Sequence, residues 1–75
     1  MDSKTEKQIE VAFTYHAPKE GQAAMYETLR VAAKTLAFCI AELCPEGRER
    51  SLALTKLEES VMWANAAIAR HDMEG

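Results

Sequence analysis

The chain of 75 residues is 48% hydrophobic and 28% charged, a composition that excludes the low-complexity and disordered classes. Its length allows one small domain, and its formal net charge of −3 argues against a surface dedicated to duplex nucleic acid, which needs a basic excess. The polar start MDSKTEKQIE and the lack of any apolar run of about 20 residues favour a soluble cytosolic protein that makes no use of a membrane.

The first part of the chain divides into a polar stretch and an alternating one. Residues 1–8 are polar and predict a flexible N-terminus. Apolar side chains then occupy every second position of IEVAFTYHAP: Ile9, Val11, Phe13 and Tyr15. Such alternation places one set of side chains on one side of an extended backbone, and Pro18 disfavours a helix at the residue before it. The pattern predicts a strand or an extended arm over residues 9–18.

From residue 20 the apolar period becomes helical. The spacing alternates between four and three along one seam: Gln22, Tyr26, Leu29, Ala33, Leu36, Ile40 and Leu43. This pattern is typical of an amphipathic helix that packs in the manner of a coiled coil. Pro45 ends the helix because its ring would clash with the preceding turn. The sequence therefore predicts a helix over residues 20–44 and a turn over residues 45–47.

A second helix is predicted over residues 48–72. Its seam has the same spacings: Leu54, Leu57, Val61, Ala64 and Ile68. Two helices of about 25 residues each span roughly 37 Å, and the short PEG link forces them to run antiparallel. We therefore expect an all-α fold, an antiparallel two-helix hairpin with a short extended N-terminal arm, in one hairpin domain over residues 9–75.

The two cysteines, Cys39 and Cys44, are five residues apart and form no CxxC motif. On one helix their side chains would point about 140° apart, which makes a disulfide or a shared zinc ion implausible. Buried or half-buried free thiols in a reducing cytosol are the simpler expectation.

An isolated hairpin would leave a second set of apolar side chains in water. Chains of this size rarely gain more than about 3–5 kcal/mol from one core, and two helices make a poor core. We therefore expect a helical homo-oligomer, with hairpins paired into bundles and the arms crossing to neighbours. The expected interface residues are aromatic rings and methionines: Phe13, Met25, Phe38, Met62 and Trp63.

One constellation suited to a ligand lies in FTYHAPKEGQ and the start of the first helix. It combines aromatic rings, amides and cations: Tyr15, His16, Lys19, Gln22, Tyr26 and Arg30. Rings stack on bases, amides read base edges and cations hold phosphates, so these residue types match a cyclic nucleotide. Tyr15 and Tyr26 are explained equally well as half-buried packing residues.

The second helix offers two further candidates. Lys56, Trp63 and Arg70 are seven apart, so the indole lies between two cations on one side of the helix. Trp63 either fills a gap between subunits or stacks on a base. Arg48 and Arg50 lie at a helix N-terminus, where backbone N–H groups and guanidinium groups bind anions, although exposed arginines at a turn are common.

Catalysis has little support in the sequence. His16 and His71 have no sequence partner that defines a base or a nucleophile, and no GxSxG, HExxH or P-loop pattern occurs. His71 with Asp72 is more often a pair at a helix end than a metal site. We expect a protein that is not an enzyme and needs neither a metal nor a cofactor.

Two long segments carry a family resemblance. FTYHAPKEGQAAMYETLR and CPEGRERSLALTKLEESVMWANAAIAR resemble the phage hairpin domain shared by the anti-CBASS and Thoeris anti-defence sponge proteins. The resemblance covers about residues 12–71, and its most specific parts are YHxPxxGQ, SLAxTxLE and MWANAAIAR.

The resemblance implies a function and a set of site residues. Members of that family are helical hairpins that assemble into oligomers, commonly hexamers, and bind cyclic nucleotide signals of bacterial immunity without cleaving them. Their ligands include cyclic dinucleotides, cyclic trinucleotides and cyclic ADP-ribose isomers, held in pockets between subunits. By resemblance, Tyr15 stacks on a base and Arg30 holds a phosphate. The other pocket residues implied are Arg48, Arg50, Thr55, Asn65 and Arg70.

Asn65 would then hydrogen-bond to the ligand or to a neighbouring subunit. Such a protein would act in the cytoplasm of the infected host cell. Two other classes stay open on the residues alone. One is a helical oligomeric scaffold or regulator that binds a protein partner and no small ligand, and the other is a hydrolase that degrades the signal.

Overall fold

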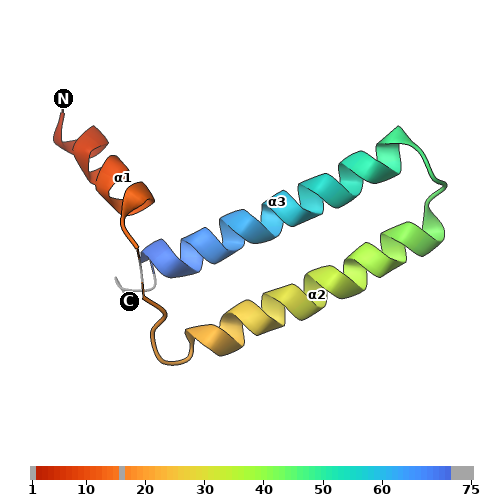
Figure 1. The fold of residues 1–75 in the computed structure, drawn as a ribbon, viewed down its shortest axis with the longest axis horizontal. Helices are drawn as coiled ribbons and strands as arrows, with labels where there is room; N and C mark the ends of the chain where they lie inside the picture. Colours follow the sequence, from red (N-terminus) through yellow and green to blue (C-terminus); the bar gives the residue numbers. More distant parts are fainter. Residues whose placement is uncertain (1, 16, 72–75) are drawn as a thin grey trace.

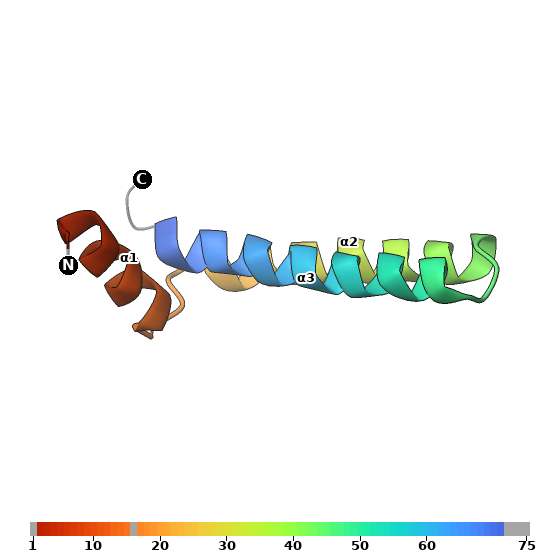
Figure 2. The same cartoon turned by 90° about the horizontal axis from the view of Figure 1, so that it is seen from above.

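The computed structural model describes residues 2–15 and 17–71, and this part of the chain contains three helices and no strand. They are α1 (Ser3–Phe13), α2 (Gln22–Leu43) and α3 (Arg48–His71). In Figure 1, α2 and α3 run antiparallel and side by side, and α1 lies beside the end of α3. Seen from above, α1 extends past the end of that pair, so the molecule measures 47 × 32 × 17 Å (Figure 2). The all-α class is confirmed, with three helices where two were expected.

The N-terminal helix α1 corrects the expectation of an extended arm from residue 9. Asp2 caps the helix, because its Oδ1 accepts a hydrogen bond from the backbone N–H of Thr5 at 3.3 Å. Hydrogen bonds from the side chain and the backbone of Thr5 hold the pKa of the Asp2 carboxyl below its ordinary value. The capped run SKTEKQIE is rich in good helix formers, and it outweighs a short alternation of apolar residues. The backbone becomes extended only at Thr14.

The first long helix was expected over residues 20–44, and α2 begins two residues later and ends one residue earlier than that. Gly21 has φ 88, a left-handed conformation that glycine adopts without strain, and α2 begins at the next residue. At its other end, the backbone N–H of Cys44 donates to the carbonyl of Ile40 at 2.9 Å, and Pro45 follows. The helix α3 then begins at Arg48. Asp72, the expected last residue of that helix, lies outside the described residues.

The facing sides of α2 and α3 are lined by half-buried apolar residues. In α3 the seam is the expected one: Leu54, Leu57, Val61, Ala64 and Ile68 are all half-buried. In α2 it drifts, because Ala37 is half-buried whereas Leu36 and Leu43 are exposed. A straight helix repeats every 3.6 residues, so a strict seven-residue pattern rotates by about 20° per heptad away from the contact line. The contact line of α2 therefore shifts by one residue at Ala37, whereas that of α3 keeps the expected spacing.

Two hydrogen bonds between side chain and backbone fix the register of α2 against α3. At the end where α2 begins and α3 ends, called the open end below, the side-chain amide of Gln22 donates to the carbonyl of Ile68 at 3.3 Å. At the turn of residues 44–47, called the closed end, Nη1 of Arg50 donates to the carbonyl of Ala41 at 3.2 Å. Each end of the hairpin is thus held by one side chain that reaches a backbone carbonyl of the other helix.

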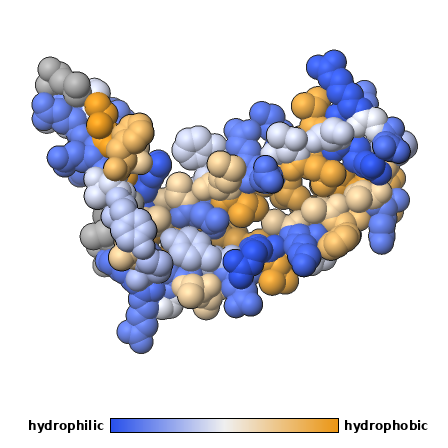
Figure 3. All heavy atoms as spheres, viewed as in Figure 1, coloured by the Kyte–Doolittle hydropathy of each residue, from blue (hydrophilic) through white to orange (hydrophobic). Residues whose placement is uncertain are grey.

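No hydrophobic residue is fully buried in the part of the chain that the structure describes. Figure 3 shows apolar side chains along both α2 and α3 on the face it presents. The expected interface residues are all exposed: Phe13, Met25, Phe38, Met62 and Trp63. Cys39 and Cys44 are exposed free thiols, so the expectation of buried or half-buried thiols is wrong, because both lie off the contact line with α3. Across the described residues, no helix combines the length and the apolar character needed to cross a bilayer.

Candidate functional site

The residues expected to bind a ligand divide between the two ends of the hairpin. Towards the open end lie Tyr15, Gln22, Tyr26, Arg30, Asn65 and Arg70. Near the closed end lie Arg48, Arg50 and Thr55. His16, the remaining candidate, lies outside the described residues. The open end therefore carries the larger share of the candidates.

The two groups are far apart within one chain. Arg50 bonds to Ala41, which lies 11 positions from Arg30 along α2, so these two arginines are separated by roughly 16 Å along the helix axis. Arg70 lies 20 positions from Arg50 along α3, or roughly 30 Å. One small ligand cannot reach both ends of a single hairpin. The candidates define either two separate sites or one site shared between chains.

Gln22 is the most enclosed candidate, with 2% of its surface exposed. Its Oε1 accepts a hydrogen bond from the backbone N–H of Lys19 at 2.7 Å, and its Nε2 donates to the carbonyl of Ile68. The amide thereby ties the segment before α2 to the end of α3. Gln22 therefore fixes the backbone at Lys19 and Ile68, and its own contact with a ligand stays a prediction.

Asn65 carries an unsatisfied polar atom. Its Oδ1 is buried, and no donor among the described residues reaches it. Asn65 lies about one turn inward from the Gln22–Ile68 link, at the level of half-buried Tyr26 on α2. A buried acceptor without a donor costs about 1–3 kcal/mol, so a donor from outside the chain would be stabilising.

At the closed end, the two arginines have different environments. Arg48 is the first residue of α3 and is exposed. Arg50 is half-buried, and its guanidinium is directed to a carbonyl in the last turn of α2, where a cation also complements the helix dipole. The expected anion site at the start of α3 therefore has one arginine exposed and one already engaged. Thr55 is exposed further along α3.

The expected cation–indole–cation row on α3 is altered by an ion pair. Nζ of Lys56 lies 3.3 Å from Oε2 of Glu59, so one of the two cations is partnered within the helix. Trp63 is 63% exposed in the single chain. Arg70, at the other side of the indole along the helix, is half-buried and faces α1 instead.

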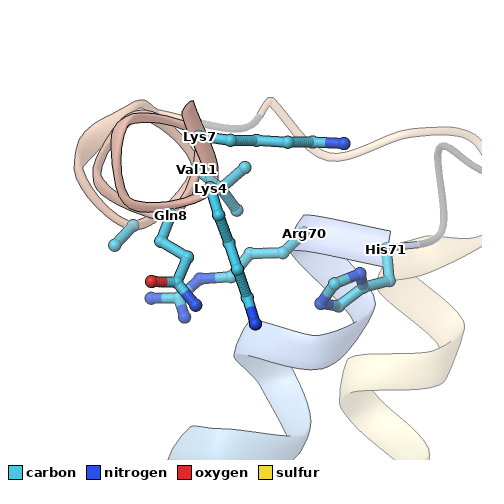
Figure 4. A pocket seen from close by; sticks show the side chains of 7 residues that line it. Lys4, Lys7, Gln8, Val11, Arg70 and His71 are labelled. Atoms are coloured by element: carbon cyan, nitrogen blue, oxygen red, sulfur yellow. The ribbon is translucent and has the colours of Figure 1, made fainter. Parts of the chain in front are cut away.

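A basic crevice between α1 and the end of α3 is a feature that the sequence did not predict. It has a volume of about 510 Å³ and is lined by Lys4, Lys7, Gln8, Val11, Ala12, Arg70 and His71. In Figure 4, Lys4 reaches from α1 towards α3, and Arg70 reaches from α3 towards α1. The spacing of Lys4, Lys7 and Val11 by three and four residues is the signal that could have placed them on one helical face.

The described part of the chain offers no set of side chains that could bind a metal ion. Within residues 2–15 and 17–71, no group of three or more histidine, cysteine, aspartate or glutamate side chains is placed to hold a metal ion.

The fold defines a small all-helical chain dominated by one long helical pair with polar candidates concentrated at its open end. Residues 5–69 match the Acb2/Tad1 hairpin domain, and the chain belongs to this family. The match confirms the resemblance to the anti-CBASS and Thoeris anti-defence sponge proteins. No curated protein and no solved structure matches the chain.

Proposed function

We propose that this protein sequesters a cyclic nucleotide immune signal without cleaving it, as a homo-oligomer in the cytoplasm of an infected host cell. The ligand classes are cyclic dinucleotides, cyclic trinucleotides and cyclic ADP-ribose isomers. Membership of the Acb2/Tad1 hairpin-domain family, over nearly the whole chain, is the observation that carries this proposal. The exposed apolar surface and the polar open end support it.

Assembly is the first part of the proposal. A chain of 75 residues with no fully buried hydrophobic side chain among the described residues has little of the burial that stabilises small domains. Large apolar side chains are exposed on both long helices, Phe38 on α2 and Trp63 on α3 among them. Their burial against other copies, with a hexamer as the expected state, would supply the missing core and create pockets between subunits.

Ligand capture is the second part. Tyr15 is exposed and lies in the segment before α2, where its ring is free to stack on a base. Arg30 is exposed on α2 and would hold a phosphate through charge-assisted hydrogen bonds. The buried Oδ1 of Asn65 could accept a donor from the ligand or from a neighbouring subunit.

Sequestration needs affinity and a slow off-rate, and it needs no general acid or base. The proposal can therefore be tested by following both the protein and the ligand. Binding to the folded state raises the melting temperature in proportion to the logarithm of ligand concentration, so a thermal-shift series with cyclic nucleotides should give a concentration-dependent rise. The matching linear dinucleotides serve as controls for ring recognition.

The fate of the ligand separates a sponge from a hydrolase. After incubation, the protein is denatured and the released nucleotide is analysed by chromatography. We expect the cyclic nucleotide to be recovered intact. Recovery of a linear product would contradict sequestration and favour degradation.

A second candidate is a helical scaffold or regulator that binds a protein partner. The exposed apolar side chains that favour self-association would serve such a partner equally well. The same thermal-shift series separates the two functions, because a scaffold without a ligand pocket gains no stability from any cyclic nucleotide.

A further inference from the structure

The basic crevice has a charge that contrasts with the chain as a whole. Three cations from two helices line it, Lys4 and Lys7 from α1 and Arg70 from α3, and no acidic side chain among the described residues does. The whole chain carries a formal net charge of −3. Three of the nine lysine and arginine residues therefore lie at one concave place, while the rest of the chain is net acidic.

The orientation of α1 produces this concentration. At about 100° per residue, Lys4, Lys7 and Val11 lie on one face of the helix. Glu6 and Glu10 lie roughly 200° and 240° around the helix from Lys4, on the opposite face. Figure 4 shows Lys4 directed to the end of α3, whereas the side chain of Lys7 extends sideways from α1 and away from Arg70 in that view. Both lysines of α1 therefore belong to the lining of the crevice, and neither of its glutamates does.

We propose that this crevice is a phosphate-binding subsite built within a single chain, with Lys4 and Lys7 as ligand-positioning residues beside Arg70. The inference rests on the proposed function and adds two residues and the helix α1 to its site. The ligand chemistry that fits is a phosphodiester carrying two or more negative charges, because two lysines of α1 and one arginine of α3 line the same crevice.

The crevice also has features beyond charge. Val11 and Ala12 form an apolar part of its wall, and Gln8 places an amide there that can donate and accept hydrogen bonds. A sugar or base edge attached to the phosphate would find both kinds of contact. A volume of about 510 Å³ is within the range of about 300–1,000 Å³ usual for small-molecule sites.

The subsite can be tested by removing its charges one at a time. Lys4→Gln, Lys7→Gln and the double variant keep side chains of similar length on a solvent-exposed helix, so α1 should remain folded by circular dichroism. Lys34→Gln is the matched control, because Lys34 is an exposed lysine on α2 away from the crevice. The ligand is the cyclic nucleotide that gives the largest thermal shift, and its Kd is measured by calorimetry at two salt concentrations.

We expect each single variant to weaken binding about threefold and the double variant about tenfold, with a shallower dependence on salt because fewer counterions are displaced. Lys34→Gln should stay within about twofold of the unmodified protein, since long-range effects of one exposed charge are screened. A double Lys4→Arg/Lys7→Arg variant keeps the charge and should restore the affinity.

Two results would overturn the subsite, and only the second of them would also overturn the proposed function. If the unmodified protein binds a cyclic nucleotide and the double glutamine variant binds it equally well, the crevice is not a subsite and the proposed function still stands. If the unmodified protein binds no cyclic nucleotide, the proposed function and the subsite are both wrong.

Discussion

The two ends of the hairpin are held together in different ways. At the closed end the chain itself joins α2 to α3 through residues 44–47, and Arg50 adds one hydrogen bond from an exposed region. At the open end the helices meet without a covalent link, and a nearly fully buried amide, that of Gln22, joins α3 to the segment before α2. The open end is also where α1 approaches and where the basic crevice lies.

This difference between the two ends indicates which end is better suited to bind a ligand. A turn of four residues joins the helices at the closed end, and of its two arginines Arg50 is already engaged by the carbonyl of Ala41. The open end brings together three separate segments, α1, the start of α2 and the end of α3, and it combines rings, amides and cations from all of them. It also contains the buried oxygen of Asn65, which has no donor among the described residues.

The largest effect should come from the exposed indole in the open half. Trp63→Asp removes an apolar side chain that is exposed in the single chain, so the stability of the hairpin itself should change little. An assembly that buries the ring should lose about 2 kcal/mol or more of association free energy per subunit. We expect dissociation and loss of helicity at micromolar concentration, measured by sedimentation velocity and circular dichroism.

Two further variants sharpen this result. Phe38→Asp makes the same change in the closed half and should also weaken assembly, while Trp63→Phe keeps an aromatic ring and should preserve it. Unchanged assembly of Trp63→Asp would place the indole outside the interface.

The next effect concerns ligand affinity. Arg30→Ala removes an exposed guanidinium from the open half, and we expect binding to weaken at least tenfold, since a charge-assisted hydrogen bond contributes about 1.5–3 kcal/mol. The oligomer should stay intact. Arg48→Ala makes the same change at the closed end, and calorimetry on both variants compares the two ends directly. Unchanged affinity of Arg30→Ala would remove Arg30 from the site.

Breaking the open-end link should cost stability. Gln22→Leu keeps the side chain's bulk but leaves the N–H of Lys19 and the carbonyl of Ile68 without their partner, at about 1–3 kcal/mol. Amide hydrogen exchange should accelerate at the start of α2 and the end of α3 and stay unchanged near the turn. Gln22→Glu keeps the acceptor for Lys19 and should lie between. Uniform acceleration along both helices would contradict a local role for Gln22.

The smallest effect should come from the closed end. Arg50→Met keeps the apolar part of the side chain and removes its donor to Ala41 together with its positive charge. Because the turn already joins the helices, we expect a loss of about 0.5–1.5 kcal/mol, the net contribution of an ordinary hydrogen bond. Chemical denaturation of Arg50→Met beside Gln22→Leu measures the two links on one scale. A larger loss for Arg50→Met would reverse the proposed contrast between the ends.

Local signals in the sequence predicted the two long helices well. Pro45 and Gly47 marked the turn, and the seam from Leu54 to Ile68 is the one that the structure shows. The N-terminal helix was missed because four alternating apolar residues looked like a strand, while the Asp2 cap and the helix-forming run after it carried the stronger signal. A short alternation of apolar residues is weak evidence for a strand when a helix N-cap precedes it.

The candidate site was only partly predictable for a different reason. Residue types pointed to Arg30 and Arg70, but the link from Gln22 to Ile68 joins residues 46 positions apart, and no local pattern reveals it. The crevice depends in the same way on where α1 lies relative to α3, which brings Lys4, Lys7 and Arg70 into one lining. The polar N-terminus is part of the proposed site because of where α1 lies relative to α3, and not because of any local sequence pattern.

Sedimentation velocity at micromolar protein with a cyclic nucleotide present tests assembly and sequestration together, because the absorbance of the protein and that of the nucleotide are followed in one run. We expect a single species larger than one chain, with the nucleotide moving at the same rate. A well-folded single chain that leaves the nucleotide behind would contradict both the assembly and the sequestration that depends on it.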